Sequence, residues 1–573
     1  MNKHLSIIFY RMIINNLLVM IGNFMDSNNS TLEWMLHWSL PKYSPRNSQV
    51  RLINEINVAI KKGFKNIILE AGTGIGKSAI ATTLANMYDD SYILTMTKQL
   101  QEQYLDDFEE ILVEIKGRGN YKCNYKGSCD FFIKAEYNLR RCCDCEFRIA
   151  FKEAQKAKNV ITNYDFLYYG GVVNPILDSR ELLILDEAHN LERKMLMLSS
   201  SELNREYIST KFGIDIFEPV MHFTKSIYDL KRNPEYWIGI CNDLIRECKK
   251  RIKKIEGDAN KSVQVSLDEF ESNPSKYSDF DYVEKQNLEQ DLKTFVEISL
   301  GLSSKDLIID LPDKDIILDN KMDISAEFKP FSVVDDTQNL LSLGNIRIFL
   351  TGTLGSKDKF CKWNNIDPDE THYIYEKSPF DVAKRPIYID FVGRMSGNGR
   401  RGPKWKNKRA IDKVKELLDK HENEKGVIHT SSNEQAFWII NQLKDYPLVF
   451  VGGENRNAVL KKFSLSKGNS VLIGASIKDG VDFKGDLCRF QIIYKIPYPQ
   501  LNEQVKYRRE IDPKWFYYQT VMALMQAYGR GIRDEDDWCV MYIIDSSFKE
   551  LFEYNRGFFN EYFTEAVQKE VKG

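Results

Sequence analysis

The stretch IILEAGTGIGKSAIATTLANMY, residues Ile67–Tyr88, decides the fold. Its apolar start has the composition of a buried strand, and the run after Gly76 has helical spacing. Between the two, glycines permit backbone dihedrals and a close approach that side chains would block. A glycine-rich turn between a strand and a helix is typical of a phosphate-binding loop.

This loop predicts how a nucleoside triphosphate is held. Backbone N–H groups point at phosphate oxygens, and the positive end of the following helix dipole faces the same anion. Lys77 is expected to reach the β and γ phosphates, and the Ser78 hydroxyl is expected to hold Mg²⁺. Ala71 stands where the strict pattern begins with glycine. The residues predicted to bind the nucleotide here are Gly72, Thr73, Gly74, Gly76, Lys77 and Ser78.

A second motif supplies two carboxylates. The apolar run Leu182–Leu185 ends at Asp186 and Glu187, which Ala188 and His189 follow. We expect Asp186 to lie near Mg²⁺, and Glu187 to orient or deprotonate the attacking water. Taken alone, the two carboxylates could cap a helix. Together with the glycine loop, they predict a site that hydrolyses ATP.

Upstream of the loop, Gln49 stands at the start of a helical run. Its side-chain amide can donate and accept hydrogen bonds at the same time, which is the pairing that adenine needs. We therefore expect Gln49 to bind the base, although a surface glutamine at the start of a helix is common.

The alternation of strand, turn and helix recurs in both halves of the chain. It predicts an α/β fold of two lobes, each with a parallel sheet wrapped by helices. Residues 193–340 differ, because they are rich in Lys, Glu, Asp and Leu at helical spacing, which predicts a mostly helical insertion in the first lobe. The predicted strands include Asn66–Glu70, Tyr92–Met96, Leu182–Leu185, Arg347–Leu350, Gly426–His429, Val471–Gly474 and Phe490–Lys495.

The chain has 573 residues, 43% of them hydrophobic and 28% charged, which is enough for three or four folded units. The formal net charge of −2 excludes an overall basic coat, so contact with nucleic acid requires local grooves. The first 24 residues are apolar, but Arg11, Asn15 and Asn16 interrupt them, and a clean span of about 20 apolar residues is absent. We expect a loosely packed extension and no membrane anchor.

Five of the ten cysteines fall between Cys123 and Cys145. Such clustering indicates a metal site and a reducing compartment, because a chain of this size builds its core without disulfides. Thiolates at Cys123, Cys129, Cys142 and Cys145 can hold a four-iron cluster or a zinc ion, and their spacing does not separate the two. Cys143 competes with Cys142, whose spacing to Cys145 gives the more relaxed chelate.

Beyond these motifs, the chain resembles superfamily 2 helicases, and within them the iron-sulfur group typified by XPD and DinG, over about residues 45–545. The resemblance implies two RecA-like parallel-sheet lobes, with an iron-sulfur insertion and a helical arch insertion in the first lobe. Ala71 in the glycine loop is familiar in these helicases. Four further motifs carry the resemblance: TGTL at Thr351–Leu354, SPF at Ser378–Phe380, KDGVDFKGD at Lys478–Asp486 and QAYGRGIR at Gln526–Arg533.

The last two motifs imply what the second lobe contributes. Gln526, Arg530 and Arg533 lie four and seven residues apart on one helix face, so they can contact one γ-phosphate together. The arginines would stabilise charge on the transferring phosphoryl group, and ATP would lie between the lobes. The family more often has Trp-Glu-Gly where this chain has Lys-Asp-Gly, and Asp482 is expected to hold the ribose or to couple the cleft to the bound strand.

The resemblance also favours iron over zinc. GRGNYKC, which ends at Cys123, and CEFRIAFKEAQKAKNVITNYDFL, which begins at Cys145, are similar to the sequences around the cluster in XPD and DinG. A 4Fe-4S cluster on the four cysteines is therefore implied. Its expected work is structural, since it would pin a small domain that wedges against the duplex junction.

Two segments that follow strands could grip a nucleic-acid backbone, Thr95–Tyr104 in the first lobe and His429–Gln435 in the second. Their hydroxyl and amide groups suit phosphate contacts, and they equally suit caps of the helices that follow. The resemblance implies single-stranded and forked DNA as partners. A basic and aromatic patch suited to stacked bases consists of Lys116, Arg118, Tyr121, Lys122 and Tyr125.

We therefore predict a monomeric ATP-dependent DNA helicase that moves 5′ to 3′, with ATP, Mg²⁺ and a 4Fe-4S cluster, on the cytoplasmic nucleoid or in a nucleus. A nucleic-acid-dependent ATPase or architectural subunit that does not separate strands would carry the same motifs, and an RNA substrate stays open. The predicted segments are an N-terminal extension (1–40), the first lobe (41–114, 161–192 and 341–375), the iron-sulfur insertion (115–160), the arch-like insertion (193–340) and the second lobe (376–573).

Overall fold

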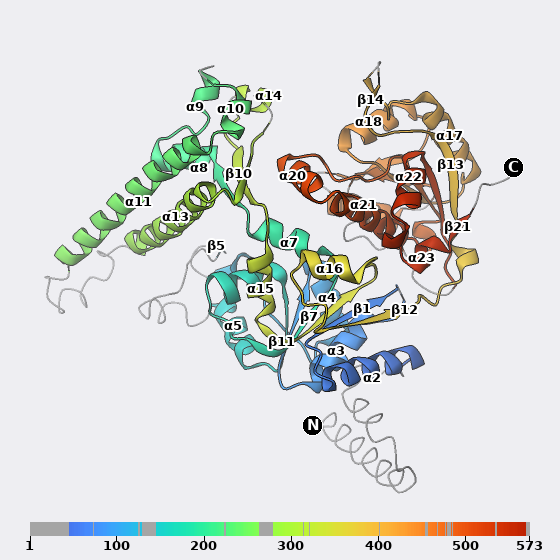
Figure 1. Cartoon of the computed structure of the whole chain (residues 1–573), viewed down its shortest axis with the longest axis horizontal. Coiled ribbons are helices and arrows are strands. Elements are labelled where there is room, and N and C mark those ends of the chain that lie inside the picture. Colours follow the sequence, from blue (N-terminus) through green and yellow to red (C-terminus); the bar gives the residue numbers. More distant parts are fainter. Residues whose placement is uncertain are drawn as a thin grey trace, which may run out of the picture.

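The structure is a computed structural model. It shows two lobes, each with a seven-stranded parallel sheet, and an insertion that rises from the first lobe (Figure 1). The predicted fold class is therefore confirmed. Among the described helices, none is both long and apolar enough to cross a membrane. The described residues are 45–72, 74–123, 127–128, 145–222, 225–262, 279–312, 314–319, 321–399, 402–452, 456–466, 468–475, 477, 483, 485–532 and 536–568.

The first lobe is built on a sheet whose strands all run parallel. Its central strands are apolar and buried along their length, because helices cover both faces. In order across the sheet, the strands are β12 (Thr371–Glu376), β1 (Asn66–Ala71), β11 (Gly344–Thr351), β7 (Arg180–Leu185), β2 (Ser91–Thr95), β6 (Asn159–Asn163) and β3 (Val113–Glu114).

Alternate residues of these strands face two separate cores. Ile67 and Leu69 of β1 pack on one side, and Ile68 packs on the other. The first core includes α2 (Asn47–Lys61), α3 (Lys77–Met87) and α4 (Lys98–Phe108). The second includes α5 (Glu146–Lys156), α6 (Tyr164–Leu167), α7 (Leu191–Leu198), α15 (Val334–Leu341) and α16 (Lys357–Trp363).

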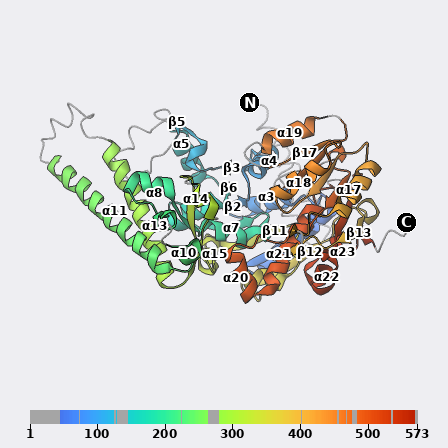
Figure 2. The ribbon, with the colours of Figure 1, turned by 90° about the horizontal axis from the view of Figure 1, so that it is seen from above.

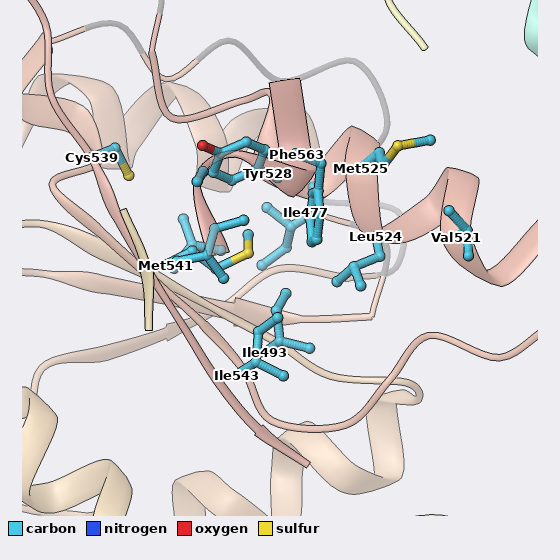
Figure 3. Packing of buried hydrophobic residues seen from close by; sticks show 14 of the residues in the cluster. Ile477, Ile493, Val521, Leu524, Met525, Tyr528, Cys539, Met541, Ile543 and Phe563 are labelled. Atoms are coloured by element: carbon cyan, nitrogen blue, oxygen red, sulfur yellow. The ribbon is translucent and has the colours of Figure 1, made fainter. Parts of the chain in front are cut away.

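The second lobe repeats this design. Figure 3 shows one of its cores, where Leu524 of α21 faces Ile493 and Ile543 of the sheet. Its strands, again all parallel, are β17 (Leu448–Phe450), β18 (Val471–Gly474), β16 (Gly426–His429), β19 (Phe490–Ile493), β20 (Val540–Asp545), β13 (Ile387–Gly393) and β21 (Val567–Gln568). Its helices are α17 (Lys408–Lys420), α18 (Asn433–Gln442), α19 (Arg456–Leu465), α20 (Glu503–Ile511), α21 (Pro513–Tyr528), α22 (Ser547–Tyr554) and α23 (Glu561–Thr564).

The insertion is mostly helical, as expected, but it also contains a three-stranded antiparallel sheet, which the sequence analysis did not anticipate. Trp237, fully buried, lies in its core. Two long helices, α11 (Pro234–Ser262) and α13 (Asp279–Ser303), project from the body as a pair (Figures 1 and 2). The other elements are β8 (Ser201–Asn204), β10 (Ser325–Pro330), β9 (Leu307–Asp310), α8 (Arg205–Phe212), α9 (Glu218–Met221), α10 (Ile227–Lys231) and α14 (Lys314–Leu318).

Gly344, at the start of β11, has no room for a side chain. A Cβ at this position would fall against the Cβ of Leu183 and lie 3.1 Å from its backbone nitrogen. Gly344→Ala is therefore expected to destabilise the protein by about 1–3 kcal/mol through overpacking, seen as a lower midpoint of thermal unfolding by circular dichroism.

The matched control is Gly239→Ala in α11, where an added Cβ meets nothing within 4 Å. Alanine is a better helix former than glycine by about 1 kcal/mol, so this midpoint should stay or rise. Equal midpoints in the two variants would contradict the packing described for β7 and β11.

Candidate active site

Three motifs meet at one edge of the first sheet, because parallel strands bring their carboxyl ends together. The loop at 72–76 follows β1, Asp186 follows β7, and Gly352 follows β11. The register places the end of β1 beside the end of β11, and the end of β11 beside that of β7. The glycine loop, the two carboxylates and the TGTL segment therefore share one site.

The backbone of the loop requires glycine at two positions. Gly74 and Gly76 have φ of +88° and +81°, in the left-handed region that residues with a side chain rarely adopt. Gly76 also immediately precedes α3, whose first N–H groups have no partner within the helix. This arrangement can bind an anion in front of α3.

The SPF segment packs directly on the loop. A Cβ on Gly72 would lie 2.6 Å from the Cβ of Ser378, and a Cβ on Gly74 would lie 2.5 Å from the ring of Phe380. Phe380 is buried and belongs to a core of the second lobe. The small size of these two glycines therefore lets the chain cross between the lobes against the nucleotide loop.

Two side chains from opposite sides hold the loop in place. Lys77 Nζ donates to the carbonyl oxygen of Ala71 at 2.9 Å. Gln49 Nε2 donates to the carbonyl oxygen of Ile75 at 2.9 Å, and Gln49 Oε1 accepts from the Arg46 N–H at 2.9 Å. Gln49 thus braces the loop, and its amide keeps a second donor hydrogen and a second lone pair for a base.

Asp186 is buried at the end of β7, and two donors fix its carboxylate. The Tyr104 hydroxyl donates to Oδ2 at 3.0 Å, and the Glu187 N–H donates to Oδ1 at 2.9 Å. Burial, followed by the negative charge of Glu187, raises the pKa of Asp186 to about 6. Carboxylate and hydroxyl oxygens, here from Asp186 and Ser78, are the donor type that Mg²⁺ prefers, so the residues present fit the predicted ion.

Glu187 adopts an unusual backbone conformation. Its φ of 53° lies in the left-handed region, where a residue other than glycine is strained. The chain turns there from β7 into the short helix Ala188–Asn190, and Glu187 Oε2 lies 3.5 Å from His189 Nδ1. The strain is localised where the predicted water-activating carboxylate stands.

His189 joins the DEAH segment to the TGTL segment. Its Nδ1 lies 2.9 Å from Thr351 Oγ1, and that hydroxyl donates its single hydrogen to the carbonyl oxygen of Thr353 at 2.8 Å. The hydroxyl can then only accept from His189, which assigns the proton to Nδ1. Nε2 is left to accept from the Asn190 amide at 2.6 Å.

The charges around His189 come from both lobes. Burial lowers its pKa to about 4, so the ring is neutral. The charge of Glu187 opposes this effect, and the positive charges of Arg193, Arg530 and Lys77 add to it. Arg530 belongs to the second lobe, and Lys77 belongs to the glycine loop. Cations from the two lobes therefore act on the same imidazole.

Helix α21 spans the contact between the lobes. Near its start, Trp515 Nε1 donates to Glu192 Oε2 of α7 at 2.8 Å. One turn later, the Tyr518 hydroxyl donates to the carbonyl oxygen of Leu354 in the TGTL segment at 2.8 Å. Gln526 lies near the end of the same helix, but the helix ends at Tyr528 and Arg530 stands in the turn beyond it, so the prediction that the two share one helix face is wrong. One helix therefore carries a predicted catalytic residue and anchors to α7 and the TGTL segment of the first lobe.

A cavity of about 1840 Å³ opens between the lobes and the insertion. His189 and Arg193 line it from the first lobe, and residues 430–433, Lys495 and Gln526 line it from the second. Hydroxyl groups and cations are the groups that bind a phosphate backbone without reading sequence. The cavity therefore has the chemistry of a nucleic-acid site beside the nucleotide site.

The two segments that could grip phosphates begin their helices in the same way. The Thr97 hydroxyl accepts from the Leu100 N–H at 3.2 Å, and the Ser432 hydroxyl accepts from the Gln435 N–H at 3.2 Å. Both hydroxyls therefore cap helices, which is one of the two roles expected from the sequence. The second segment also lines the cavity, so a phosphate contact stays a prediction there.

The basic and aromatic patch beside the cysteines is partly used inside the protein. Tyr121 accepts a hydrogen bond from the Lys116 N–H at 3.1 Å, and its ring packs edge-on against Phe147 at 5.6 Å. The Arg118 guanidinium lies 5.3 Å from the same Phe147 ring, and Lys116 pairs with Glu114 at 2.9 Å. These residues hold the ends of the cysteine-rich segment, residues 123–145, against the first lobe, where Phe147 is buried.

Several predicted positions cannot be placed. Cys123 lies in β4 (Lys122–Cys123), which pairs with β5 (Gly127–Ser128), and Cys145 immediately precedes α5. Within the described ranges, no three His, Cys, Asp or Glu residues gather to hold a metal ion. That finding leaves the cluster a prediction, because Cys129 and Cys142 lie outside the described part of the chain. The other predicted positions outside it are Thr73, Tyr125, Cys143, Asp482, Arg533 and the extension 1–40.

Sequence reasoning did not single out Tyr104, Tyr164 or Glu192. Tyr164 donates to the backbone carbonyl of Asp186 at 3.0 Å, so two buried tyrosines hold that residue. A tyrosine on the inner face of a helix is typical of core packing, and a glutamate near a helix start is typical of a cap. Only the folded chain shows that these side chains meet the catalytic motifs.

Comparisons with known proteins match both halves of the chain. The family described as "Helicase C-terminal domain" matches residues 405–564, and "Type III restriction enzyme, res subunit" matches residues 42–216. A probable ATP-dependent helicase of Methanocaldococcus jannaschii is 21% identical over 608 residues, covering 88% of this chain and 92% of the relative. The Fanconi anemia group J protein homolog of Gallus gallus is 31% identical over 104 residues, 15% of this chain and 8% of that protein.

Solved XPD structures share the fold. One XPD helicase structure superposes with a TM-score of 0.59 at 16% identity, covering 92% of this chain and 100% of the other. An apo XPD structure gives 0.55 at 16% identity, covering 91% and 100%. Two parallel-sheet lobes, an ATP motif in the first and a match to the helicase C-terminal domain in the second support an ATP-dependent helicase. The fold is that of the solved XPD structures, which confirms the resemblance found in the sequence.

The neutral state of His189 predicts how stability depends on pH. Its pKa of about 4 in the folded protein lies below the ordinary value near 6.5, so the unfolded chain binds the proton first. The stability contributed is present above pH 6.5 and is lost as the pH falls. Between pH 7 and 5, the loss should be about 2 kcal/mol.

His189→Gln should therefore lose less thermal stability than the wild type when the pH is lowered from 7 to 5. His222→Gln, at an exposed histidine, is the control and should behave like the wild type. Identical pH profiles for His189→Gln and the wild type would show that His189 is not held neutral by burial.

Proposed function

We propose that this helicase moves 5′ to 3′ along single-stranded DNA and separates duplex DNA, with ATP hydrolysed between its lobes. The observation that carries the proposal is that the second lobe packs directly on the nucleotide motifs of the first. Phe380 lies against Gly74 of the glycine loop, and the Tyr518 hydroxyl of α21 donates to the carbonyl oxygen of Leu354 at 2.8 Å. The charges of Lys77 and Arg530 also both act on His189, which supports a triphosphate bound between the two lobes.

Each predicted residue has a role in this scheme. Lys77 binds the β and γ phosphates, while Ser78 and Asp186 hold Mg²⁺. Glu187 orients the attacking water or takes its proton. Negative charge that develops on the transferring phosphoryl group is stabilised from the second lobe by Gln526, Arg530 and Arg533. The remaining nucleotide contacts are Gln49 with the base, Gly72, Thr73, Gly74 and Gly76 with the phosphates, and Asp482 with the ribose.

Hydrolysis couples to movement because the γ-phosphate is the group that both lobes contact. When it leaves, the second lobe loses its partner and the cleft can open. The strand would lie along the cavity lined by Arg193, Lys495 and residues 430–433, where contacts to phosphates are independent of sequence. One chain holds both sides of the nucleotide site, so we propose that the helicase works as a monomer. We further propose that it works on a nucleoid or in a nucleus.

We also propose that Cys123, Cys129, Cys142 and Cys145 hold a 4Fe-4S cluster. The support is the sequence around the cysteines and the packing at the base of the segment, where Tyr121 and Phe147 meet. Thiolates are the ligands that such clusters use, and the cluster would give a short segment a rigid core of its own. Such a segment could act as the wedge at a fork.

ATP turnover with and without single-stranded DNA tests the motor. Wild type should be stimulated at least about 10-fold by DNA, and Lys77→Ala should lower kcat by about 100-fold or more, because the loop loses its cation for the γ-phosphate. Lys61→Ala, an exposed lysine at the end of α2, should leave kcat unchanged. Turnover that ignores added DNA would instead fit an enzyme acting on a small molecule.

A tailed duplex tests polarity and strand separation. We expect ATP-dependent displacement of the strand from a 5′-tailed DNA substrate and none from a 3′-tailed one. Displacement from the 3′ tail alone would overturn the direction. Robust DNA-stimulated hydrolysis with no displacement from either tail would favour a translocase or an architectural ATPase, and a matched RNA-tailed substrate tests the remaining alternative.

Metal analysis of anaerobically purified protein tests the cluster. We expect about four irons per chain and a brown colour with absorption at about 400 nm, lost in Cys145→Ser. Cys241→Ala, which removes a buried thiol from the core of the arch-like insertion, should keep the iron. Colourless wild-type protein with one zinc per chain would show that the four thiolates hold zinc.

A further inference from the structure

The arch-like insertion joins the first lobe at a narrow neck. The chain leaves the first lobe after α7, which belongs to the core of that lobe, and it returns after β10, through Phe331. Both α7 and the segment that follows β10 contact α20, which belongs to the second lobe. In Figure 1, α20 reaches from the second lobe toward β10 and α7.

Three side chains of α20 contact α7 and the segment at the end of β10. Arg508 forms an ion pair with Glu192, and its NH1 donates to the carbonyl oxygen of Phe331 at 3.2 Å. The Tyr507 ring lies 4.0 Å from the ring of Phe331. Gln504 adds a hydrogen bond to the carbonyl oxygen that ends β10, at 2.9 Å.

The pairing of Arg508 with Glu192 is difficult to break. The exposed fractions of the two side chains are only 16% and 5%, and Trp515 Nε1 also donates to Glu192 at 2.8 Å. A buried charge that loses its partner is strongly destabilising. The neck and the second lobe should therefore stay in contact when the nucleotide site changes.

Helix α20 is also connected directly to the nucleotide side of the second lobe. It leads into α21 through Asp512, and α21 ends beside the predicted phosphate contacts Gln526 and Arg530. A movement of α21 toward or away from the triphosphate must therefore displace α20. The insertion neck lies at the other end of that path.

We propose that α20 is a lever on the neck, which swings the insertion relative to the first lobe whenever the lobes close on ATP. Arg508 and Glu192 are the positioning residues at the pivot. The inference rests on the proposed closure of the lobes around ATP. It goes beyond that closure, because it assigns the insertion a movement driven by the nucleotide although no predicted nucleotide ligand lies in it.

Distances between spin labels test the lever in the full chain. Labels on genetically encoded residues at exposed Lys61 (α2), Lys250 (α11) and Asp412 (α17) report on the first lobe, the insertion and the second lobe without using the native cysteines. Addition of Mg²⁺ and a non-hydrolysable ATP analogue should change both the Lys61–Asp412 and the Lys61–Lys250 distances in the wild type.

The double variant Glu192→Gln/Arg508→Gln removes both charges together, so no buried charge is left alone. It should still show the change between the lobes, while the change between the first lobe and the insertion falls to less than half. Lys362→Gln is the matched control. It removes an exposed ion pair between the lobes, Lys362–Asp512 at 3.4 Å, away from the neck, and both distance changes should persist.

Two results would overturn the lever: lobes that close in the wild type while the insertion stays still, or a double variant whose insertion moves as far as in the wild type. An unchanged Lys61–Asp412 distance would instead show that the lobes do not close on ATP. The proposed function then fails as well, so the two failures are distinguishable. A thermal midpoint of the double variant close to that of the wild type establishes that the protein is folded.

Discussion

The packing of α21 across the cleft is the contact on which the rest of this molecule depends. Trp515 fixes the start of the helix to α7, and the Tyr518 hydroxyl fixes its next turn to the TGTL segment. Because a helix is stiff along its axis, these anchors also position its far end at Tyr528. Arg530 follows in the next turn, and its charge acts on His189. This contact joins two similar α/β lobes into one nucleotide site, in which the second lobe can move. Through α20, the contact also extends to the neck of the insertion.

Much of the fold could be predicted from the sequence, because parallel sheets that are covered on both faces leave apolar runs with sharp ends. Gly426–His429 and Val471–Gly474 were predicted with the bounds that the structure gives. The loop was equally readable, since the left-handed backbone at Gly74 and Gly76 requires glycine, and the carboxylate motif follows a strand as expected. Because the glycine loop and the carboxylate motif occur in one chain, the two motifs together indicated the class of protein.

Other features could not be predicted, since they depend on contacts between distant segments. Strand β6 begins at Asn159, inside the segment predicted to be the iron-sulfur insertion. It was missed because only a short apolar centre lies between its polar end residues. The sheet β8-β10-β9 was missed because its strands are short and half exposed. The closure of Phe380 over Gly74 and the hydrogen bond from Tyr104 to Asp186 join residues far apart in the chain, which leave no local pattern.

The central claim is that one nucleotide is held by both lobes at once. A crystal or cryo-electron microscopy structure with Mg²⁺, ADP and aluminium fluoride, which imitates the phosphoryl group in transfer, tests it most directly. We predict Lys77 and Arg530 on opposite sides of the fluoride, each at a hydrogen-bonding distance of about 3 Å. A nucleotide bound by the glycine loop alone, with Arg530 remote from it in a closed molecule, would contradict the claim.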